Sequence, residues 1–252
     1  MARPEANAQA EILKLARLLQ VDPEELSYLE QIPAAQVRRL REQVTDMLFS
    51  AHNQTLEKLA AASKLLPVAL VALLAERAFG PVLAARMAGL LEPGRAVAVA
   101  ARLPAAFLAE TARQLDPRRT SAVISGIPPE RIAEIARVLG AERDFLTMGQ
   151  AVGQLSGEAL RASVGELDDE MLLRTAFVMD DKDRLPELAA MLGHDRLIGM
   201  IDVAERAGLE DEATDLISHL NQSQRNELLS ELRDRDEQAH QQVVGRLAAG
   251  GG

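Results

Sequence analysis

Residues 81–104 read PVLAARMAGLLEPGRAVAVAARLP and residues 105–128 read AAFLAETARQLDPRRTSAVISGIP, and these two blocks of equal length decide the expected fold. Each block carries Leu-Glu-Pro or Leu-Asp-Pro near its middle and ends on a proline that follows an apolar residue. Proline fits the first turn of a helix, where its missing N–H is not needed, and it disfavours helix in the residue before it. The repeat therefore predicts helical hairpins with firmly placed turns.

The second block shows the helical periodicity most clearly. Leu108, Thr111, Ala112 and Leu115 follow the i, i+3, i+4, i+7 spacing of one helix face. Asp116 is then placed to cap the next helix, ahead of the proline that follows it.

A further copy of the pattern lies near the N-terminus, where Val21-Asp22-Pro23 precedes Ile32-Pro33 by nearly the same interval. Here Glu25 can reach back to the amide of Asp22 and close a capping box.

Downstream the pattern continues with looser spacing. Apolar stripes over Ile132–Leu139 and Ala213–Leu220 predict further helices, and we expect the first to stop at Gly140. Asp168-Asp169 and Asp180-Asp181 stand where Asp-Pro stood earlier, so we expect them to cap helices. Helices of roughly 8–12 residues are marginal alone in water, so neighbours must hold them. We predict an all-α superhelical stack of short helical hairpins, an α-solenoid.

Composition agrees with a helical fold and limits the chemistry. Hydrophobic residues make up 48% of the 252, but aromatic residues only 2%, which disfavours sheets. The absence of cysteine excludes disulfides, thiolate metal sites and cysteine nucleophiles. Up to residue 126 there are 15 Lys/Arg and 13 Asp/Glu, and the remainder has 13 and 25. The acidic second half disfavours nucleic-acid binding there, and a solubilising surface is the simpler interpretation.

We divide the chain into an N-terminal helical segment that packs on the repeats (1–56), a helical-repeat domain (57–236), and a fraying helix with a flexible tail (237–252). The N-terminus lacks the apolar core of a signal peptide. The longest apolar run, Leu65–Ala75, is interrupted by Pro67 and is shorter than the ~20 residues that a bilayer requires. We therefore expect a cytoplasmic protein without a membrane span.

Four motifs carry a resemblance to a known family: Leu91-Glu92-Pro93, Leu115-Asp116-Pro117, the run IPPERIAEIARVL at 127–139, and Met179-Asp180-Asp181. With them, residues 65–235 resemble the cytoplasmic N-terminal domain of MgtE-type magnesium transporters, a right-handed superhelix of short helices related to the helical domains of the flagellar switch protein FliG. The resemblance implies the fold. It does not imply transport, because this sequence has no counterpart of the family's regulatory and transmembrane domains, and no magnesium ligand of the family can be matched residue by residue.

The sequence offers no convincing metal site, and we expect neither a metal nor a cofactor. The acidic stretches Asp168-Asp169-Glu170, Asp180-Asp181 and Glu210-Asp211-Glu212 lack the alternating ligands of a calcium loop, and we interpret them as helix starts. No metal-ligand spacing links the four histidines, His52, His194, His219 and His240.

Two groups of arginines are candidate binding residues. Arg38, Arg39 and Arg41 lie on one helix of a three-helix segment, which would suit a DNA reader, but nearby glutamates offset them. Arg118-Arg119 falls in the first turn of a helix, where the macrodipole disfavours cations. A partner carboxylate, a bound anion or simple solvent exposure would each account for the pair.

We predict no catalytic residues and no enzymatic activity. The sequence has no Ser-His-Asp order and no paired carboxylates with an apolar pocket. Glycines at 149, 153, 157 and 165 follow no phosphate-loop order. We interpret Gly149 and Gly153 as positions where two helices approach closely.

The segment from Leu65 to Leu108 is the most unusual, because it has few polar positions. Such a helix is normally buried, but if it is not fully covered it lines a groove or cavity. The first functional hypothesis is a non-enzymatic interaction module that binds a protein partner or self-associates. The alternative is a carrier or sensor of a hydrophobic small molecule through an apolar pocket near 65–108, and a DNA-binding regulator is less favoured. A cavity of ~300–1,000 Å³ would favour the carrier, and an exposed apolar strip over a filled interior would favour the module.

Overall fold

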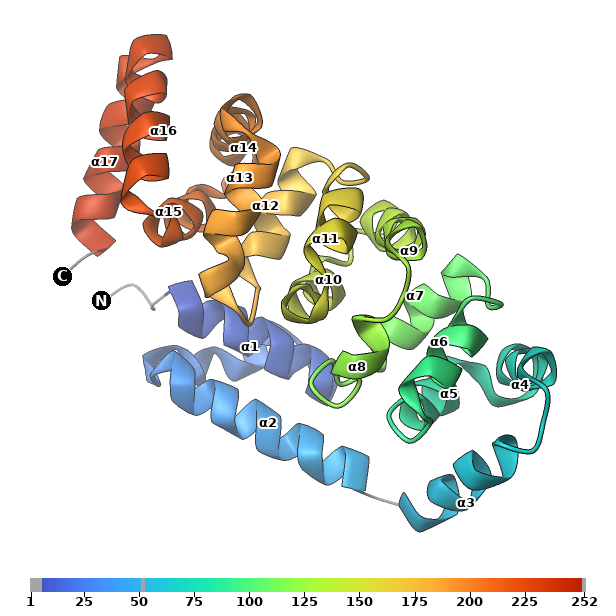
Figure 1. Cartoon of the computed structure of the whole chain (residues 1–252). Helices are drawn as coiled ribbons and strands as arrows, with labels where there is room; N and C mark the ends of the chain where they lie inside the picture. Colours follow the sequence, from blue (N-terminus) through green and yellow to red (C-terminus); the bar gives the residue numbers. More distant parts are fainter. Residues whose placement is uncertain (1–5, 51–52, 251–252) are drawn as a thin grey trace.

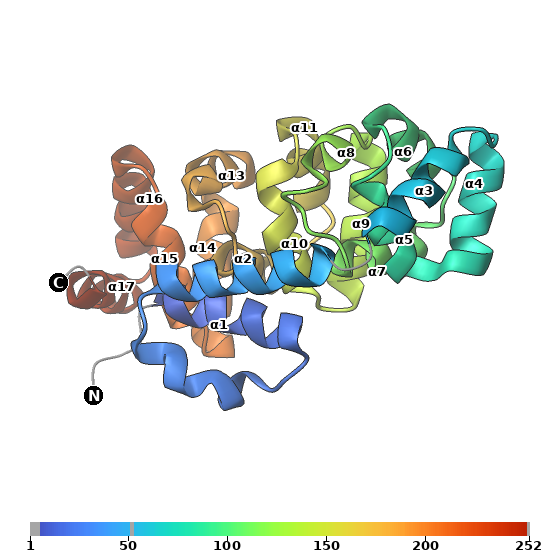
Figure 2. The same cartoon turned by 90° about the horizontal axis from the view of Figure 1, so that it is seen from below.

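The computed structural model describes residues 6–50 and 53–250, and this part of the chain is all-α, with seventeen α-helices and no strand. The N-terminal segment contains α1 (Ala6–Leu19), a 3-10 helix (Pro23–Gln31) and α2 (Ala34–Ser50). The helices that follow α2 succeed one another along an elongated body, and α1 and α2 lie along one side of it (Figures 1 and 2). Helices contact mainly their near neighbours in the chain.

The first half of the body contains α3 (Asn53–Ser63), α4 (Val68–Leu74), α5 (Gly80–Ala88), α6 (Pro93–Ala100), α7 (Ala105–Arg113), α8 (Ser121–Ile124) and α9 (Pro129–Ala141). The second half contains α10 (Phe145–Ala151), α11 (Gly157–Val164), α12 (Asp169–Phe177), α13 (Leu185–Leu192), α14 (His194–Ala207), α15 (Glu210–His219), α16 (Gln222–Arg235) and α17 (Glu237–Gly250). One hydrophobic cluster extends from α4 to α17. The segment predicted to fray thus forms α17, which packs along α16.

Several predicted helix starts are confirmed by side-chain hydrogen bonds. Asp22 accepts from the Glu24 amide at 3.0 Å, and Glu25 accepts from the Asp22 amide at 3.2 Å, which closes the predicted capping box. The carboxylates of Glu92 and Asp168 cap α6 and α12. The chain therefore encodes these boundaries locally.

The predicted stop at Gly140 is wrong, because α9 continues past it and the left-handed position is Arg143, with φ 56°. Gly140 instead allows close packing, since a Cβ there would lie 2.8 Å from Leu167 Cδ2. The close approach predicted at Gly149 is confirmed, because a Cβ there would lie 2.6 Å from Val178 Cγ2 on the segment after α12.

Four arginines make the same long-range contact with the backbone. Each guanidinium donates to carbonyl oxygens at the end of an earlier helical segment, between 28 and 32 residues back. The contacts join Arg95 to Ser63 and Leu66, Arg131 to Leu103, Arg184 to Val152 and Leu155, and Arg196 to Val164 and Leu167. Carbonyls at a helix end lack intrahelical partners and favour cations, so each arginine ties one helical unit to the unit before it.

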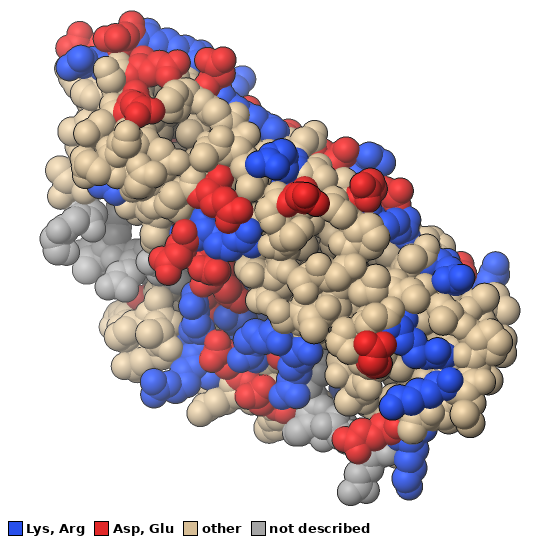
Figure 3. Space-filling view, viewed as in Figure 1, with Lys and Arg blue, Asp and Glu red and all other residues tan. Residues whose placement is uncertain are grey.

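A buried ion network joins the N-terminal segment to the body. Glu11 accepts from Lys14 at 2.6 Å, from Arg38 at 3.1 Å and from Arg41 at 2.9 Å. Lys14 also donates to Asp180 at 2.6 Å, which corrects the expectation that Asp180 caps a helix. Burial opposes ionisation of Asp180, but Lys14 and Arg41 outweigh it and lower its pKa. Figure 3 shows acidic and basic side chains interleaved over α1 and α2.

A second anchor lies further along α1. Asp144, ahead of α10, accepts from Arg17 at 2.9 Å and from Arg113 at 2.6 Å. Burial would raise the pKa of Asp144, but the hydrogen bonds from the two guanidinium groups hold it well below its usual range. Ala10 shares a buried apolar cluster with Phe177. The N-terminal segment is therefore held by both charges and apolar packing.

The apolar segment forms a longer helix than the sequence suggested. α4, a π turn (Ala75–Phe79) and α5 make one continuous helix, Val68–Ala88, of 21 residues. Its most apolar window has a mean hydropathy of 1.7 and is only 22% buried. By length and composition alone this helix could cross a membrane. The expectation that the apolar segment is too short to span a bilayer is therefore wrong. Core helices of soluble proteins pass the same test, and the absence of a membrane span stays a prediction.

Candidate functional site

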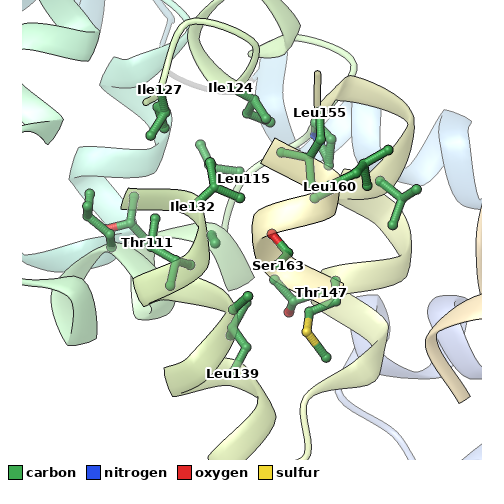
Figure 4. Close-up of a pocket in the computed structure, with 18 of the residues that line it drawn as sticks. Thr111, Leu115, Ile124, Ile127, Ile132, Leu139, Thr147, Leu155, Leu160 and Ser163 are labelled. Carbon is green, nitrogen blue, oxygen red and sulfur yellow. The ribbon is translucent and has the colours of Figure 1, made fainter. Parts of the chain in front are cut away.

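An apolar cavity of about 210 Å³, partly open to solvent, lies between helices from α4 to α15. The apolar stripes predicted on α7 and α9 both face it. Figure 4 shows side chains from α7, α8, α9, α10 and α11 converging on this space. The lining residues from the two predicted stripes are Leu108, Thr111, Ala112, Leu115, Ile132, Ile135, Ala136 and Leu139.

The apolar segment 65–108 has two surfaces. One lines the cavity and includes Val71, Phe79 and Val99. The other faces solvent: Leu65 is 87% exposed and Leu73 is 52% exposed. The sequence left open whether this segment is buried or lines a pocket, and the structure shows a pocket wall with an uncovered outer face.

The walls carry four polar side chains, all of them hydroxyls. Thr111 donates to the Phe107 carbonyl at 2.8 Å, and Ser163 donates to its own helix at 2.7 Å. Thr147 donates to Asp144 at 2.9 Å. The fourth, Thr175 on α12, is 6% exposed, and its Oγ1 makes no hydrogen bond within the described part of the chain. Periodicity located the walls, but nothing in the sequence marked this hydroxyl.

The Arg118-Arg119 pair is explained by carboxylate partners. Both guanidinium groups contact Asp116, at 3.1 Å and 3.3 Å, and Arg119 also donates to Asp46 of α2 at 2.8 Å. Glu42 lies 3.6 Å from Arg118. The helix expected after Pro117 is reduced to a turn and the four residues of α8. The pair thus joins α2 to the body.

Two of the three arginines considered for DNA binding form ion pairs within the protein. Arg38 and Arg41 bind Glu11, and Arg41 also binds Asp180 at 3.2 Å. Arg39 is exposed. Arg41 is therefore buried and paired, whereas Arg38 is paired with Glu11 but keeps a 41% exposed side chain. Carboxylate pairing of two of the three cations lowers the positive charge available to phosphates.

In the part of the chain that the structure describes, acidic and histidine side chains do not gather into a metal site. Within residues 6–50 and 53–250, no group of three or more His, Asp or Glu side chains could hold a metal ion. His194 lies 3.1 Å from Glu227 on the surface, and His219 contacts Asp215. His52 lies outside the described residues. Glu210, with its two acidic neighbours, forms the first turn of α15, as predicted.

No protein family, curated protein or solved structure shows a match to this sequence. The fold and the site define the class of protein in physical terms: an all-α chain of sequentially packed helices around an apolar cavity. The cavity and the exposed apolar residues next to it are the two features of this chain that could bind a ligand or a partner.

Proposed function

We propose that this chain is a non-enzymatic carrier or sensor that binds an apolar small molecule inside its helical stack. The apolar cavity is the observation that carries the proposal. At about 210 Å³ it exceeds the ~150 Å³ of an engineered apolar cavity that stays dry and binds benzene. It is smaller than the ~300–1,000 Å³ of drug-sized ligand sites, so the ligand is compact. This is the alternative that the sequence placed second.

We further propose that the stack is an α-solenoid related to the helical domain of MgtE-type transporters. The recurring arginine contacts support a repeated unit, because a similar separation along the chain returns at four places. The caps at Glu92 and Asp168 occupy equivalent places ahead of their helices. Such a stack can surround an elongated interior space, since each unit contacts only its neighbours.

Native mass spectrometry of the purified chain tests the carrier proposal. We expect a population heavier than the bare chain by one small molecule, which organic extraction releases because apolar contacts alone hold it. The extracted protein should then bind the neutral fluorescent probe N-phenyl-1-naphthylamine saturably, at about one molecule per chain and with a Kd near ~1 µM. A chain that carries nothing and shows no saturable binding of the probe contradicts the proposal.

The exposed apolar face gives a second candidate function, self-association. We define the apolar strip as Leu65, Leu66, Leu70, Leu73 and Val82, all exposed on or beside the helix Val68–Ala88. Contiguous exposed apolar surface marks interaction sites. A second copy of the chain would cover the strip and remove it from water, which supports the interaction module that the sequence placed first.

Sedimentation velocity tests this second function. We expect a dimer at roughly 10 µM protein, and we expect the double variant Leu70→Glu/Leu73→Glu to be monomeric because it buries two carboxylates in the interface. Val244→Glu, a change at a 40% exposed position on α17, is the matched control and should leave the dimer intact. A monomeric wild-type chain at that concentration would remove self-association from consideration.

A further inference from the structure

We infer that the apolar strip docks on a lipid bilayer with anionic headgroups. This goes beyond the carrier function, and it can fail while that function stands, because docking and ligand binding are measured separately. The strip is the outer face of a helix whose inner face lines the cavity, and the charges beside the strip determine which partner fits it.

The exposed side chains of the strip form an apolar face with no cover in the described part of the chain. Leu70 and Leu73 are three residues apart, the spacing at which side chains share a helix face. Leu65 lies just before this helix, and Val82, beyond the π turn, is 56% exposed. A bilayer offers an apolar partner of any extent, so it covers the whole strip.

The stretch that carries the strip is basic, although the whole chain is acidic. Residues 57–102 contain six Lys/Arg and three Asp/Glu, whereas the rest of the chain contains 22 Lys/Arg and 35 Asp/Glu. Of the three acids, Glu92 is already engaged, because it accepts hydrogen bonds from the amides of Gly94 and Arg95. Figure 3 shows basic side chains gathered over α3–α6, the end of the body that includes the strip.

A cation stands near each end of the exposed leucines. Lys64 directly precedes Leu65, and Arg77 follows Leu73 by four residues. Both cations are exposed, and neither forms an ion pair with another residue in 6–50 or 53–250. The pKa of Glu92 is lowered mainly by its two backbone hydrogen bonds, and the charge of Lys64 adds less. Leucines flanked by such cations suit an anionic membrane surface, where the leucines enter the acyl boundary and the cations meet phosphates.

A second copy of the chain is the other occupant of the strip, and the charges favour the bilayer over it. In a two-fold dimer the same surface meets itself, so Lys64 and Arg77 of one copy would approach those of the other. Like charges across an interface oppose association, whereas lipid phosphates carry the opposite sign. An anionic bilayer should therefore displace the second copy.

Docking at the strip also brings the cavity wall to the membrane. Val71, Ala75 and Phe79 line the cavity from the same helix that exposes Leu70 and Leu73 on its outer side. The π turn lies in this wall, and such turns inside α-helices are frequent at functional sites. The docked helix separates the cavity from the acyl chains, which shortens the path of an apolar ligand through water.

Cosedimentation of the full chain with sucrose-loaded vesicles tests docking. We expect vesicles of phosphatidylcholine with about 30% phosphatidylglycerol to bind the chain at least about tenfold more tightly than phosphatidylcholine alone, because each cation near an anionic surface contributes about fivefold. Raising the salt from roughly 0.1 M to 0.5 M should remove most of this preference, since screening shortens the reach of the charges.

Two double variants with the same loss of charge locate the effect. Lys64→Gln/Arg77→Gln should weaken binding to the anionic vesicles by about tenfold or more and leave binding to phosphatidylcholine unchanged. Arg39→Gln/Arg161→Gln, at exposed positions on α2 and α11, is the matched control and should bind as the wild-type chain does. Equal losses in the two variants would show that the charges beside the strip do not direct docking.

The remaining outcomes separate the strip, the second copy and the carrier function. Leu70→Glu/Leu73→Glu should lose binding to both kinds of vesicle, and wild-type binding by this variant would remove the strip from the membrane contact. A wild-type chain that binds neither vesicle but forms a dimer would assign the strip to the second copy. Without vesicles, Lys64→Gln/Arg77→Gln should bind N-phenyl-1-naphthylamine as the wild-type chain does, because neither residue lines the cavity. Probe binding without any preference for anionic vesicles overturns the docking inference and leaves the carrier function standing.

Discussion

Replacing Glu11 by glutamine is expected to lower the free energy of unfolding by about 3 kcal/mol or more, since breaking a buried ion pair typically costs ~3–5 kcal/mol. The Glu11 side chain is 2% exposed, and Lys14 beside it is fully buried. Both carboxylate oxygens are occupied: Oε1 accepts from Lys14 and Arg38, and Oε2 accepts from Arg41. Glutamine has one acceptor oxygen, so its NH₂ group would face one of these donors.

The loss of charge adds to the loss of hydrogen bonds. Without Glu11, three cations share the remaining carboxylate of Asp180, which is bound directly by Lys14 and Arg41. Domains are stable by only ~5–15 kcal/mol, so the change removes a large share of the total. The effect should fall on the contact between α1, α2 and the body, because the network joins these elements.

Urea denaturation followed by circular dichroism measures the change. Glu42→Gln is the matched control: this side chain is 37% exposed and lies 3.6 Å from Arg118. Exposed pairs contribute ~0–1 kcal/mol, so the control should remain close to wild type. Equal stability of the two variants would show that the network does not hold the N-terminal segment in place.

The network also shows where sequence reasoning reached its limit. The capping box at Asp22 involves residues three apart, so the sequence alone sufficed to predict it. Asp180 has the same local setting, ahead of a helix, but it binds Lys14 across 166 positions. Arg119 likewise meets Asp46 across 73 positions. Capping and helix-spacing rules predict contacts within a turn or a helix. They do not predict which charged residues far apart in the sequence the fold brings together.

The sequence predicted the apolar faces that line the cavity, but it did not predict that they enclose a space, for a similar reason. Periodicity identified the apolar faces of α7 and α9, and those faces do point inward. Whether opposite faces close on each other depends on the spacing of the helices. That spacing is set by the long-range arginine contacts and by glycines such as Gly140 and Gly149. The same periodicity is compatible with a filled core and with a cavity.

Filling the cavity with Ala136→Leu is expected to lower the affinity for N-phenyl-1-naphthylamine by about tenfold or more, which corresponds to ~1.4 kcal/mol per factor of ten. Ala136 lies on α9, is 6% exposed and lines the cavity. Leucine is nearly as good a helix former as alanine, so the helix is preserved. Its added carbons occupy the space that the probe would take.

The variant should be at least as stable as the wild-type chain without ligand. Each buried methylene contributes up to ~0.8 kcal/mol when it fills empty space, whereas forcing it into a packed core would destabilise by ~1–3 kcal/mol. The sign of the change in Tm therefore distinguishes a real cavity from a filled interior. Affinity and stability are expected to move in opposite directions.

Ala141→Leu is the matched control, because it makes the same substitution at an exposed position of the same helix. It should change neither probe affinity nor Tm.

Ala112→Leu fills the cavity from α7 and guards against a local misfit at Ala136. If both filled variants keep wild-type affinity, the probe binds elsewhere, and the apolar strip on the outer face becomes the place to look. If both lose affinity and gain stability, ligand and side chain compete for one volume, as expected for a carrier whose interior is its binding site.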